Sequence, residues 1–396
     1  MRPSRLYYGW VLVITLGVTE TISWGVLYYA FTVYLSPMES ELGWSRGDMT
    51  GAFSVATLLS GMAAIPVGRW LDRHGPRLLM TVGSIAATLL VLAWSQVTQL
   101  PQLYLIWLAI GLTMSATLYD PAFATASRWF DRQRVQALTA ITLMAGFAST
   151  IFIPLANTLV ERQGWRQSLI TLAVILAIGT IPAHALVLRR GPDRSASRSG
   201  LNVSQVIRHA SFRWLTIAFW LTSLTTVAIG VHLLPYLRDR GYDATFAATV
   251  TGSIGAMQVL ARLALTPFGN RISPRALGLG VLALQPISIA VLLLVRVTPG
   301  VLLFVVLFGA QRGLATLVRP ALIADLYGVA RYASIAGVLQ FALSVAQAAA
   351  PFGAGAAYDV LHDYEPIFWG LALISAGAVL ALVPARREPH KLQSEP

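Results

Sequence analysis

Apolar runs of about twenty residues recur along the whole 396-residue chain, and they constrain its fold more than any other feature. A run of this length is what an α-helix needs to cross a hydrocarbon core of about 30 Å. Backbone groups in lipid must bond within their own segment, so these runs are expected to be helices and not strands. The short alternating segments of a membrane β-barrel are not visible. The sequence therefore predicts an all-α membrane protein.

Twelve such runs can be counted, each separated from the next by a short basic or Pro/Gly-rich break. They lie at 8–37, 47–68, 77–97, 101–127, 135–160, 166–188, 214–237, 244–268, 276–296, 299–327, 333–358 and 366–385. The longest polar break, 189–213, holds Gly, Pro, Ser and six arginines, and it is interpreted as a cytoplasmic linker. The predicted domains are an N-terminal six-helix bundle at 1–188, this linker, and a C-terminal six-helix bundle with a short cytoplasmic tail at 214–396.

The charge composition excludes several classes of protein. Charged residues make up 12% of the chain, against about 25% in a soluble domain. The net charge of +12 does not indicate nucleic acid, because the basic residues are dispersed among apolar runs and form no continuous stripe. No metal-ligand cluster, nucleophile motif or nucleotide loop is visible, so neither a metal, a cofactor nor an enzymatic activity is expected.

The basic residues are distributed unevenly between the two sides of the predicted membrane. Twenty lie at the termini or in loops on the same side as the termini. Six lie on the other side, at Arg46, Arg162, Arg166, Arg238, Arg240 and Arg296. The positive-inside rule therefore places both termini in the cytoplasm. We expect a multi-pass protein of the cytoplasmic (inner) membrane, functional as a monomer in the lipid bilayer.

The two halves of the chain repeat each other at an offset close to half its length. Asp72, Arg73, Pro76 and Arg77 match Asn270, Arg271, Pro274 and Arg275 at an offset of 198, Pro121 matches Pro320 at 199, and Pro154 matches Pro351 at 197. Agreement on one offset indicates an internal duplication. Duplicated six-helix halves around a midplane site are a pattern of transporters. The two bundles are therefore expected to be pseudo-symmetric.

The segment GRWLDRHGPR, residues 68–77, resembles the signature loop between the second and third helices of the major facilitator superfamily. It supplies Gly68, Asp72, Arg73, Gly75 and Arg77, while Pro76 replaces one basic position. In that family the loop helps to hold the outward-open state, so these five residues are expected to control conformational gating. A carboxylate beside a helix N-terminus and near arginines suits a reversible latch. The alternative is a basic loop that only sets the topology.

Further motifs are similar to the monocarboxylate-transporter and oxalate–formate-antiporter branch of that family. They are Gly9-Trp10, Gly43-Trp44-Ser45-Arg46, Trp129-Phe130 and Gly164-Trp165-Arg166. In that branch an arginine of helix eight pairs with the substrate carboxylate, and Arg262 falls at the matching place. The proton-coupling pair of the animal carriers is absent, because Gln258 and Tyr28 stand at its two positions. Trp107 stands near the usual arginine of helix four.

Three arginines, Arg262, Arg312 and Arg319, lie inside apolar runs. A charge at mid-bilayer costs about 2.5–3.5 kcal/mol, so such residues usually face a cavity or a partner. We expect these arginines to bind an anionic group, and Arg312 and Arg319 share one helix face. The alternatives are a bond from Arg262 to a backbone carbonyl or an acid, and a structural salt bridge such as Asp120 to Arg319.

Other polar and aromatic residues in the runs complete the candidate site. Glu20 and Asp120 are predicted proton carriers, because a carboxylate at this depth is costly to keep charged. Trp24 and Tyr28 are predicted to line a substrate cavity, with His232 as a further lining residue. The alternatives are hydrogen bonding within the bundle for the polar groups and packing or lipid contact for the aromatic rings.

These features predict alternating-access transport of a small organic anion, with a monocarboxylate favoured and protons as an optional coupling ion. Efflux of an amphipathic or cationic compound is the alternative, and it would use Glu20 or Asp120 as the substrate contact. A membrane enzyme or sensor is the least favoured class. The expected architecture is twelve transmembrane helices in two pseudo-symmetric six-helix bundles, the major facilitator fold.

Overall fold

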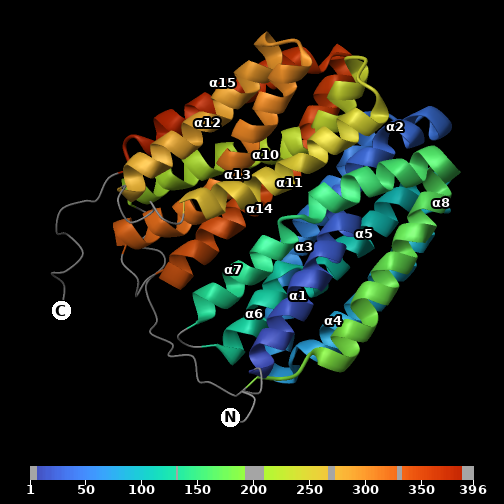
Figure 1. Cartoon of the computed structure of the whole chain (residues 1–396), viewed down its shortest axis with the longest axis vertical. Helices are drawn as coiled ribbons and strands as arrows, with labels where there is room; N and C mark the ends of the chain where they lie inside the picture. The colour runs from blue at the N-terminus through green and yellow to red at the C-terminus, as the bar shows by residue number, and fades with distance from the viewer. Residues whose placement is uncertain (1–6, 131–132, 192–208, 266–272, 328–331, 386–396) are drawn as a thin grey trace, which may run out of the picture. The chain divides into compact units, whose positions relative to one another are not determined.

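The computed structural model describes residues 7–130, 133–191, 209–265, 273–327 and 332–385, and every regular element in these ranges is a helix (Figure 1). The first helices are α1 (Tyr8–Trp24), the π-helix η1 (Gly25–Tyr29), α2 (Phe31–Leu42), α3 (Arg46–His74), α4 (Pro76–Trp94), α5 (Leu100–Thr117), α6 (Tyr119–Trp129), α7 (Arg134–Ala145) and α8 (Ala148–Val187). They are followed by α10 (Ala210–Asp239), α11 (Ala244–Leu265), α12 (Pro274–Leu294), α13 (Thr298–Tyr327), α14 (Tyr332–Leu361) and α15 (Tyr364–Leu382). Most of the predicted linker and of the predicted tail lies outside the described ranges.

Eleven helical runs in the described ranges are long and apolar enough to cross a membrane. One of them, Gln136–Val187, has 52 residues, far more than the roughly 20 that one crossing needs. Gly164 interrupts this run with a φ of 78° and a ψ of 163°, a conformation open to glycine because it lacks a Cβ. The run therefore counts as two crossings, in agreement with the separate segments predicted at 135–160 and 166–188.

The helices group into two compact units. The first unit comprises Met1–Ala196 and Val231–Ala256, and the second comprises Ser197–Gly230 and Met257–Pro396. The division into domains at 1–188, 189–213 and 214–396 stays a prediction.

The end of α10 and the start of α11 belong to the first unit, and hydrogen bonds hold them there. The Thr32 hydroxyl donates to the Val231 carbonyl at 2.6 Å. The Thr150 hydroxyl donates to the Gly252 carbonyl at 2.8 Å and accepts from the Ala256 N–H at 2.9 Å. These bonds satisfy polar groups that would be costly to leave unpaired in an apolar environment.

Aromatic rings fill the core of the first unit. Phe31, Tyr34, Phe53, Trp94 and Trp107 are each at most 1% exposed. Phe31 stacks on Phe53 at a centroid distance of 4.7 Å, and Trp107 lies edge-on to Phe31 at 4.9 Å. Trp107 stands near the position where the family resemblance expects an arginine, and its burial shows that the position serves packing here.

The core of the second unit is mostly aliphatic. It gathers buried side chains from α10, α12, α13, α14 and α15, among them Phe212, Leu215, Phe219, Leu282, Val318, Leu322, Leu339 and Leu382. Ridges of such side chains fill the grooves between neighbouring helices and fix how closely the helices pack.

Two glycines bring helices into backbone contact at corresponding places in the two units. A Cβ on Gly111 of α5 would lie 2.3 Å from the Ala56 carbonyl oxygen of α3. A Cβ on Gly313 of α13 would lie 2.4 Å from the Gln258 carbonyl oxygen of α11. Gly111 and Gly313 are 202 residues apart in the chain, and so are Ala56 and Gln258. This offset is slightly larger than the predicted repeat offset. The matching contacts support the predicted internal duplication.

Gly111→Ala is expected to destabilise the folded protein by about 1–3 kcal/mol, because the new methyl group has no room at this crossing. The matched control is Gly353→Ala in α14, where a Cβ would meet nothing within 4 Å. The control is expected to be neutral or stabilising, since alanine favours a helix over glycine by about 0.5–1 kcal/mol. Thermal unfolding of the purified variants measures the difference, and equal melting temperatures would contradict the close contact.

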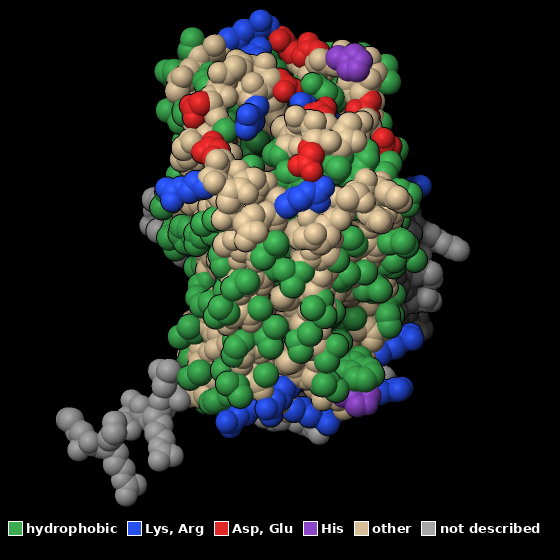
Figure 2. All heavy atoms as spheres, turned by 90° about the vertical axis from the view of Figure 1, so that its right-hand side faces the viewer, with side chains coloured by type: hydrophobic (Ala, Val, Ile, Leu, Met, Phe, Trp, Pro, Cys, Tyr) green, Lys and Arg blue, Asp and Glu red, His purple; other side chains and the backbone are tan. Residues whose placement is uncertain are grey.

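The outer surfaces of α4, α5 and α8 are apolar. Leu105 is 68% exposed and Ile178 is 72% exposed, which suits contact with lipid. Figure 2 shows hydrophobic side chains over the middle of one face, acidic and basic side chains together at its upper end, and basic ones without acidic ones at its lower end. This distribution is that of a protein crossing a membrane.

Candidate functional site

In two crossings of the first unit the α-helix is interrupted, and the two interruptions lie close to each other. The first crossing passes from α1 into the π-helix η1, a rare element that often marks functional sites. The fourth crossing is broken at Leu118, whose φ of −92° and ψ of −159° separate α5 from α6. The rings of Trp24 and Tyr119 meet across these two irregularities at a centroid distance of 5.0 Å. Interrupted helices are where transporters commonly place their ligand sites.

Five part-exposed rings surround this meeting point, and we call Trp24, Tyr28, Tyr29, Tyr119 and Phe123 the aromatic wall. Tyr119 stacks on Phe123 at 4.9 Å with an interplanar angle of 17°. Trp24 contacts Tyr28 at 5.1 Å, and Tyr28 continues to Tyr29 at 5.2 Å. The wall thus combines the predicted residues Trp24 and Tyr28 with Tyr119, which the sequence analysis did not select.

Glu20 lies one helical turn before Trp24 and is fully buried. Neither of its carboxylate oxygens has a hydrogen-bond partner in the described part of the chain, and the same holds for the Ser23 hydroxyl and the Trp24 indole N–H. A buried carboxylate without a described partner is a costly arrangement in an apolar interior, which marks Glu20 as a candidate functional group.

Asp120 lies in the first turn of α6, directly after Tyr119. It is close enough to Glu20 for the two carboxylates to repel each other. Unlike Glu20, Asp120 is exposed. An exposed acid inside a membrane crossing faces water and not hydrocarbon. The structure therefore brings both predicted proton carriers to one site, one occluded and one accessible.

The second unit carries the three predicted arginines on α11 and α13. Arg262 Nε donates to the Gly313 carbonyl at 3.1 Å, at the crossing where Gly313 packs on Gln258. Arg312 precedes Gly313, and one of its terminal nitrogens lies 3.8 Å from the place of a Cβ on Gly230. The structure thus brings Arg262 to the backbone next to Arg312. A bond from Arg262 to a backbone carbonyl was one of the alternatives that the sequence left open, and this bond is present.

Arg319 lies two helical turns farther along α13. Its Nη1 donates to the Gln340 side-chain oxygen of α14 at 3.1 Å, so this arginine is engaged within the second unit. Gln311, which the sequence analysis missed, is fully buried, and neither atom of its amide has a partner among the described residues. A glutamine beside an arginine inside an apolar run is the signal that marks it. His232 is also fully buried.

The family model described as Major Facilitator Superfamily matches residues 16–318, which is more than half of the chain. The chain belongs to the major facilitator superfamily. The expected all-α membrane fold is thereby confirmed, and the described helices are consistent with twelve crossings.

Relatives place this superfamily member near the branch that its motifs resemble. Monocarboxylate transporter 13 from Bos taurus is 25% identical over 393 residues, covering 97% of this chain and 91% of that protein. The oxalate:formate antiporter from Oxalobacter formigenes is 24% identical over 225 residues, covering 54% and 53% of the two chains. The crystal structure of the nucleoside transporter NupG has a TM-score of 0.76 at 14% identity, covers 95% of this chain and 98% of that one, and shows the shared fold. These proteins are transporters and not enzymes, as expected.

The superfamily signature loop joins α3 to α4 through Gly75, whose φ of 81° requires glycine. Arg73 and Arg77 are exposed on either side of it, and Gly68 has open space around its Cα. The side chain of Asp72 lies outside the described part of the structure. The gating role of these five residues stays a prediction.

A second charged cluster, which the sequence analysis did not foresee, lies at the start of α3. Arg46 Nε donates to Glu39 at 2.9 Å, and its two terminal nitrogens donate to Asp239 at 2.7 and 3.2 Å. We call these three residues the Arg46 network. Its bidentate guanidinium–carboxylate geometry is the strongest form of such a pair.

The branch motif Gly164-Trp165-Arg166 has a structural role. The turn at Gly164 lets the Trp165 indole donate to Glu41 at 2.5 Å, while Arg166 Nη2 donates to the other oxygen of the same carboxylate at 2.9 Å. Arg166 Nη1 also donates to the Ser95 and Val97 carbonyls at 2.9 Å. These bonds tie α8 to the ends of α2 and α4.

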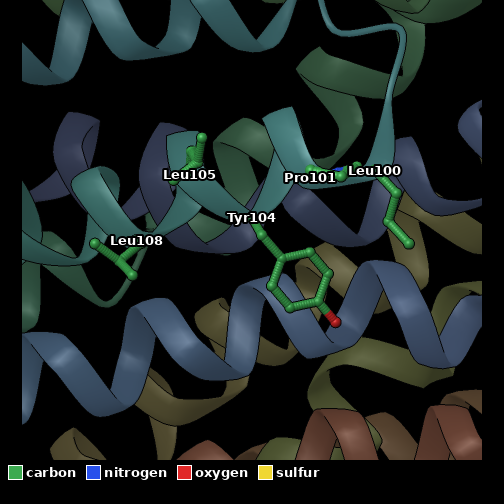
Figure 3. A pocket seen from close by; sticks show the side chains of 5 residues that line it. All are labelled: Leu100, Pro101, Tyr104, Leu105 and Leu108. Carbon is green, nitrogen blue, oxygen red and sulfur yellow. The ribbon is translucent and has the colours of Figure 1, made fainter.

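A shallow apolar groove lies on α5, lined by Leu100, Pro101, Tyr104, Leu105 and Leu108 (Figure 3). All five residues come from one helix, and none is among the predicted site residues. Its exposed leucines belong to the apolar outer surface that suits lipid. The groove is therefore separate from the candidate site.

Proposed function

We propose that the chain is a secondary active transporter that moves a small organic anion, most simply a monocarboxylate, by alternating access. Two of the relatives, a monocarboxylate transporter and an oxalate:formate antiporter, are named for substrates that carry a carboxylate. The observation that carries the proposal is the guanidinium of Arg262, whose Nε bonds the Gly313 carbonyl within a crossing. Gly313 follows Gln311 and Arg312 in the chain, and the amide of Gln311 has no partner among the described residues. Guanidinium groups recognise carboxylates through two parallel hydrogen bonds.

The proposed roles are those that the sequence predicts for these residues. Arg262 and Arg312 anchor the carboxylate, with Arg319 as a further cationic residue on the same helix. Trp24, Tyr28 and His232 contact the rest of the substrate. Glu20 and Asp120 carry protons, because one carboxylate is accessible to water and the other is occluded next to it.

We further propose that the protein lies in the cytoplasmic membrane with both termini inside, and that Gly68, Asp72, Arg73, Gly75 and Arg77 gate its conformational change. The excess of basic residues on the side of the termini supports this orientation. So does the basic lower end of the face in Figure 2.

Efflux of a cationic amphipathic compound is the second candidate function. The exposed carboxylate of Asp120 beside the aromatic wall favours it, because aromatic faces and a carboxylate attract organic cations. In that case Asp120 and not Arg262 would be the main contact with the substrate.

Thermal stabilisation of the purified full-length protein separates the two functions. Matched pairs of ligands, such as propionate with propylammonium and benzoate with benzylammonium, are compared at equal ionic strength. A ligand at 100 times its Kd raises the free energy of unfolding by about 2.7 kcal/mol, so a specific ligand gives a clear shift. Stabilisation by the acids alone is expected, whereas stabilisation by the amines alone would favour efflux of cations.

A further inference from the structure

Aromatic rings of the first unit fall into a closed set and an open set. The closed set is the core around Phe31, Phe53 and Trp107, which water does not reach. The open set is the aromatic wall, whose five rings are each partly exposed although all lie within membrane crossings. On one side, Tyr119 and Phe123 pack against a different buried cluster, which includes Leu12, Leu16 and Ile141. The exposed parts of the wall therefore belong to its other side.

The exposed Asp120, next to Tyr119 in the chain, is the feature that distinguishes this part of the wall from a lipid-facing surface. Asp120 follows Tyr119 directly in the chain and is exposed, and an accessible acid within a crossing requires an aqueous opening. Behind the wall, Glu20, Ser23 and the Trp24 indole N–H provide buried polar atoms without partners in the described residues. Part-exposed rings with a few polar groups are the usual lining of a site for a small organic molecule.

The geometry of the wall fits a flat ligand. Tyr119 and Phe123 are nearly parallel, and the Trp24 ring is inclined to Tyr119 by 45°. Aromatic rings prefer offset-stacked or edge-to-face partners, and such contacts add to the gain from burial. A short aliphatic acid has no ring to make these contacts.

We propose that the aromatic wall selects carboxylates that carry a planar aromatic ring over short aliphatic ones, with Trp24 and Tyr119 as the specificity-determining residues. This inference rests on the proposed transport of an organic anion and names its substrate class.

Three acids of the same chain length test the proposal: propionate, 3-phenylpropionate and 3-cyclohexylpropionate. Their Kd values are measured by calorimetry on the purified full-length protein in detergent. One aromatic contact worth about 0.5–1.5 kcal/mol corresponds to about a 2- to 12-fold change in Kd. The Kd of 3-phenylpropionate is expected to be lower than that of the cyclohexyl acid by about 2- to 12-fold. Propionate is expected to have the highest Kd.

Variants locate the preference. Trp24→Leu and Tyr119→Leu are expected to remove the advantage of the phenyl over the cyclohexyl acid, and Tyr119→Phe is expected to retain it. Tyr104→Leu is the matched control, because Tyr104 is a part-exposed tyrosine in the α5 groove (Figure 3). Circular dichroism and gel filtration establish that each variant is folded before binding is measured.

The outcomes separate this inference from the proposed function. Binding of all three acids with equal Kd values would overturn the aromatic preference and leave organic anion transport intact. The same preference in Trp24→Leu and Tyr119→Leu as in the wild type would overturn the role of the wall. If none of the three acids binds, the proposed function is overturned, and the preference for an aromatic acid is overturned with it.

Discussion

Arg46→Gln is expected to destabilise the protein by about 1–3 kcal/mol, because it leaves Glu39 and Asp239 without their shared cation. The Arg46 side chain is 7% exposed, whereas each of the two carboxylates is 35% exposed. Removing one member of a fully buried pair costs about 3–5 kcal/mol, and partial solvation of these carboxylates lowers that figure. Thermal unfolding in detergent measures the loss. The matched control is Arg162→Gln, an exposed arginine for which no bond is described.

A double-mutant cycle identifies the partner of Arg46. Asp239→Asn is expected to be destabilising by itself, and the double variant Arg46→Gln with Asp239→Asn is expected to lose less than the sum of the two single losses. Additive losses would show that the Arg46–Asp239 pair contributes nothing of its own.

The Arg46 network also bears on transport, because it joins residues from the two halves of the sequence. If the predicted halves 1–188 and 214–396 alternate between two arrangements, we expect the Arg46–Asp239 pair to open in each cycle, although both residues lie in the first compact unit. Arg46→Gln is therefore expected to change the rate of exchange as well as the stability of the protein.

Glu20→Gln is expected to abolish accumulation driven by an inward proton gradient while leaving exchange of substrate for substrate intact. Glutamine keeps the size and polarity of the side chain but cannot take up or release a proton. Glu20 is occluded and lacks a hydrogen-bond partner in the described structure, so the substitution removes no described bond. The expected change in stability is therefore small, and the expected change in coupling is large.

Two assays on the same proteoliposomes measure this prediction, one with a proton gradient and one with unlabelled substrate inside and no gradient. Asp48→Asn is the control, since Asp48 is an exposed carboxylate at the start of α3. Gradient-driven accumulation by Glu20→Gln at the wild-type level would remove Glu20 from the coupling mechanism.

The crossings could be predicted from the sequence because hydrophobic length is a local property. Every run from 8–37 to 366–385 corresponds to helix in the described structure, although α8 joins the end of the run 135–160 to the run 166–188. The breaks within crossings were not predictable in the same way. The interruptions at η1 and Leu118 change the local geometry without changing the hydrophobicity of the segment, so a count of apolar residues does not register them.

The candidate site was predictable in part, for a related reason. Arg262, Glu20 and Asp120 stand out because ionisable residues are rare inside apolar runs. Tyr119 and Gln311 carry no charge. The sequence marks Gln311 only by its place beside Arg312 in an apolar run, and the ring contact of Tyr119 is visible only in the fold. The Arg46 network could not be predicted because Asp239 lies 193 positions from Arg46 in the chain.

Uptake of labelled monocarboxylate into sealed proteoliposomes, with unlabelled acid inside, tests the proposed transport most directly. The wild type and the control Arg213→Gln, an exposed arginine of α10, are expected to take up the label. Arg262→Gln is compared only if its melting temperature matches that of the control. Its uptake is expected to fall at least about tenfold, because one charged hydrogen-bonding group is lost. Uptake by Arg262→Gln at the wild-type rate would contradict the guanidinium anchor on which the anion assignment depends.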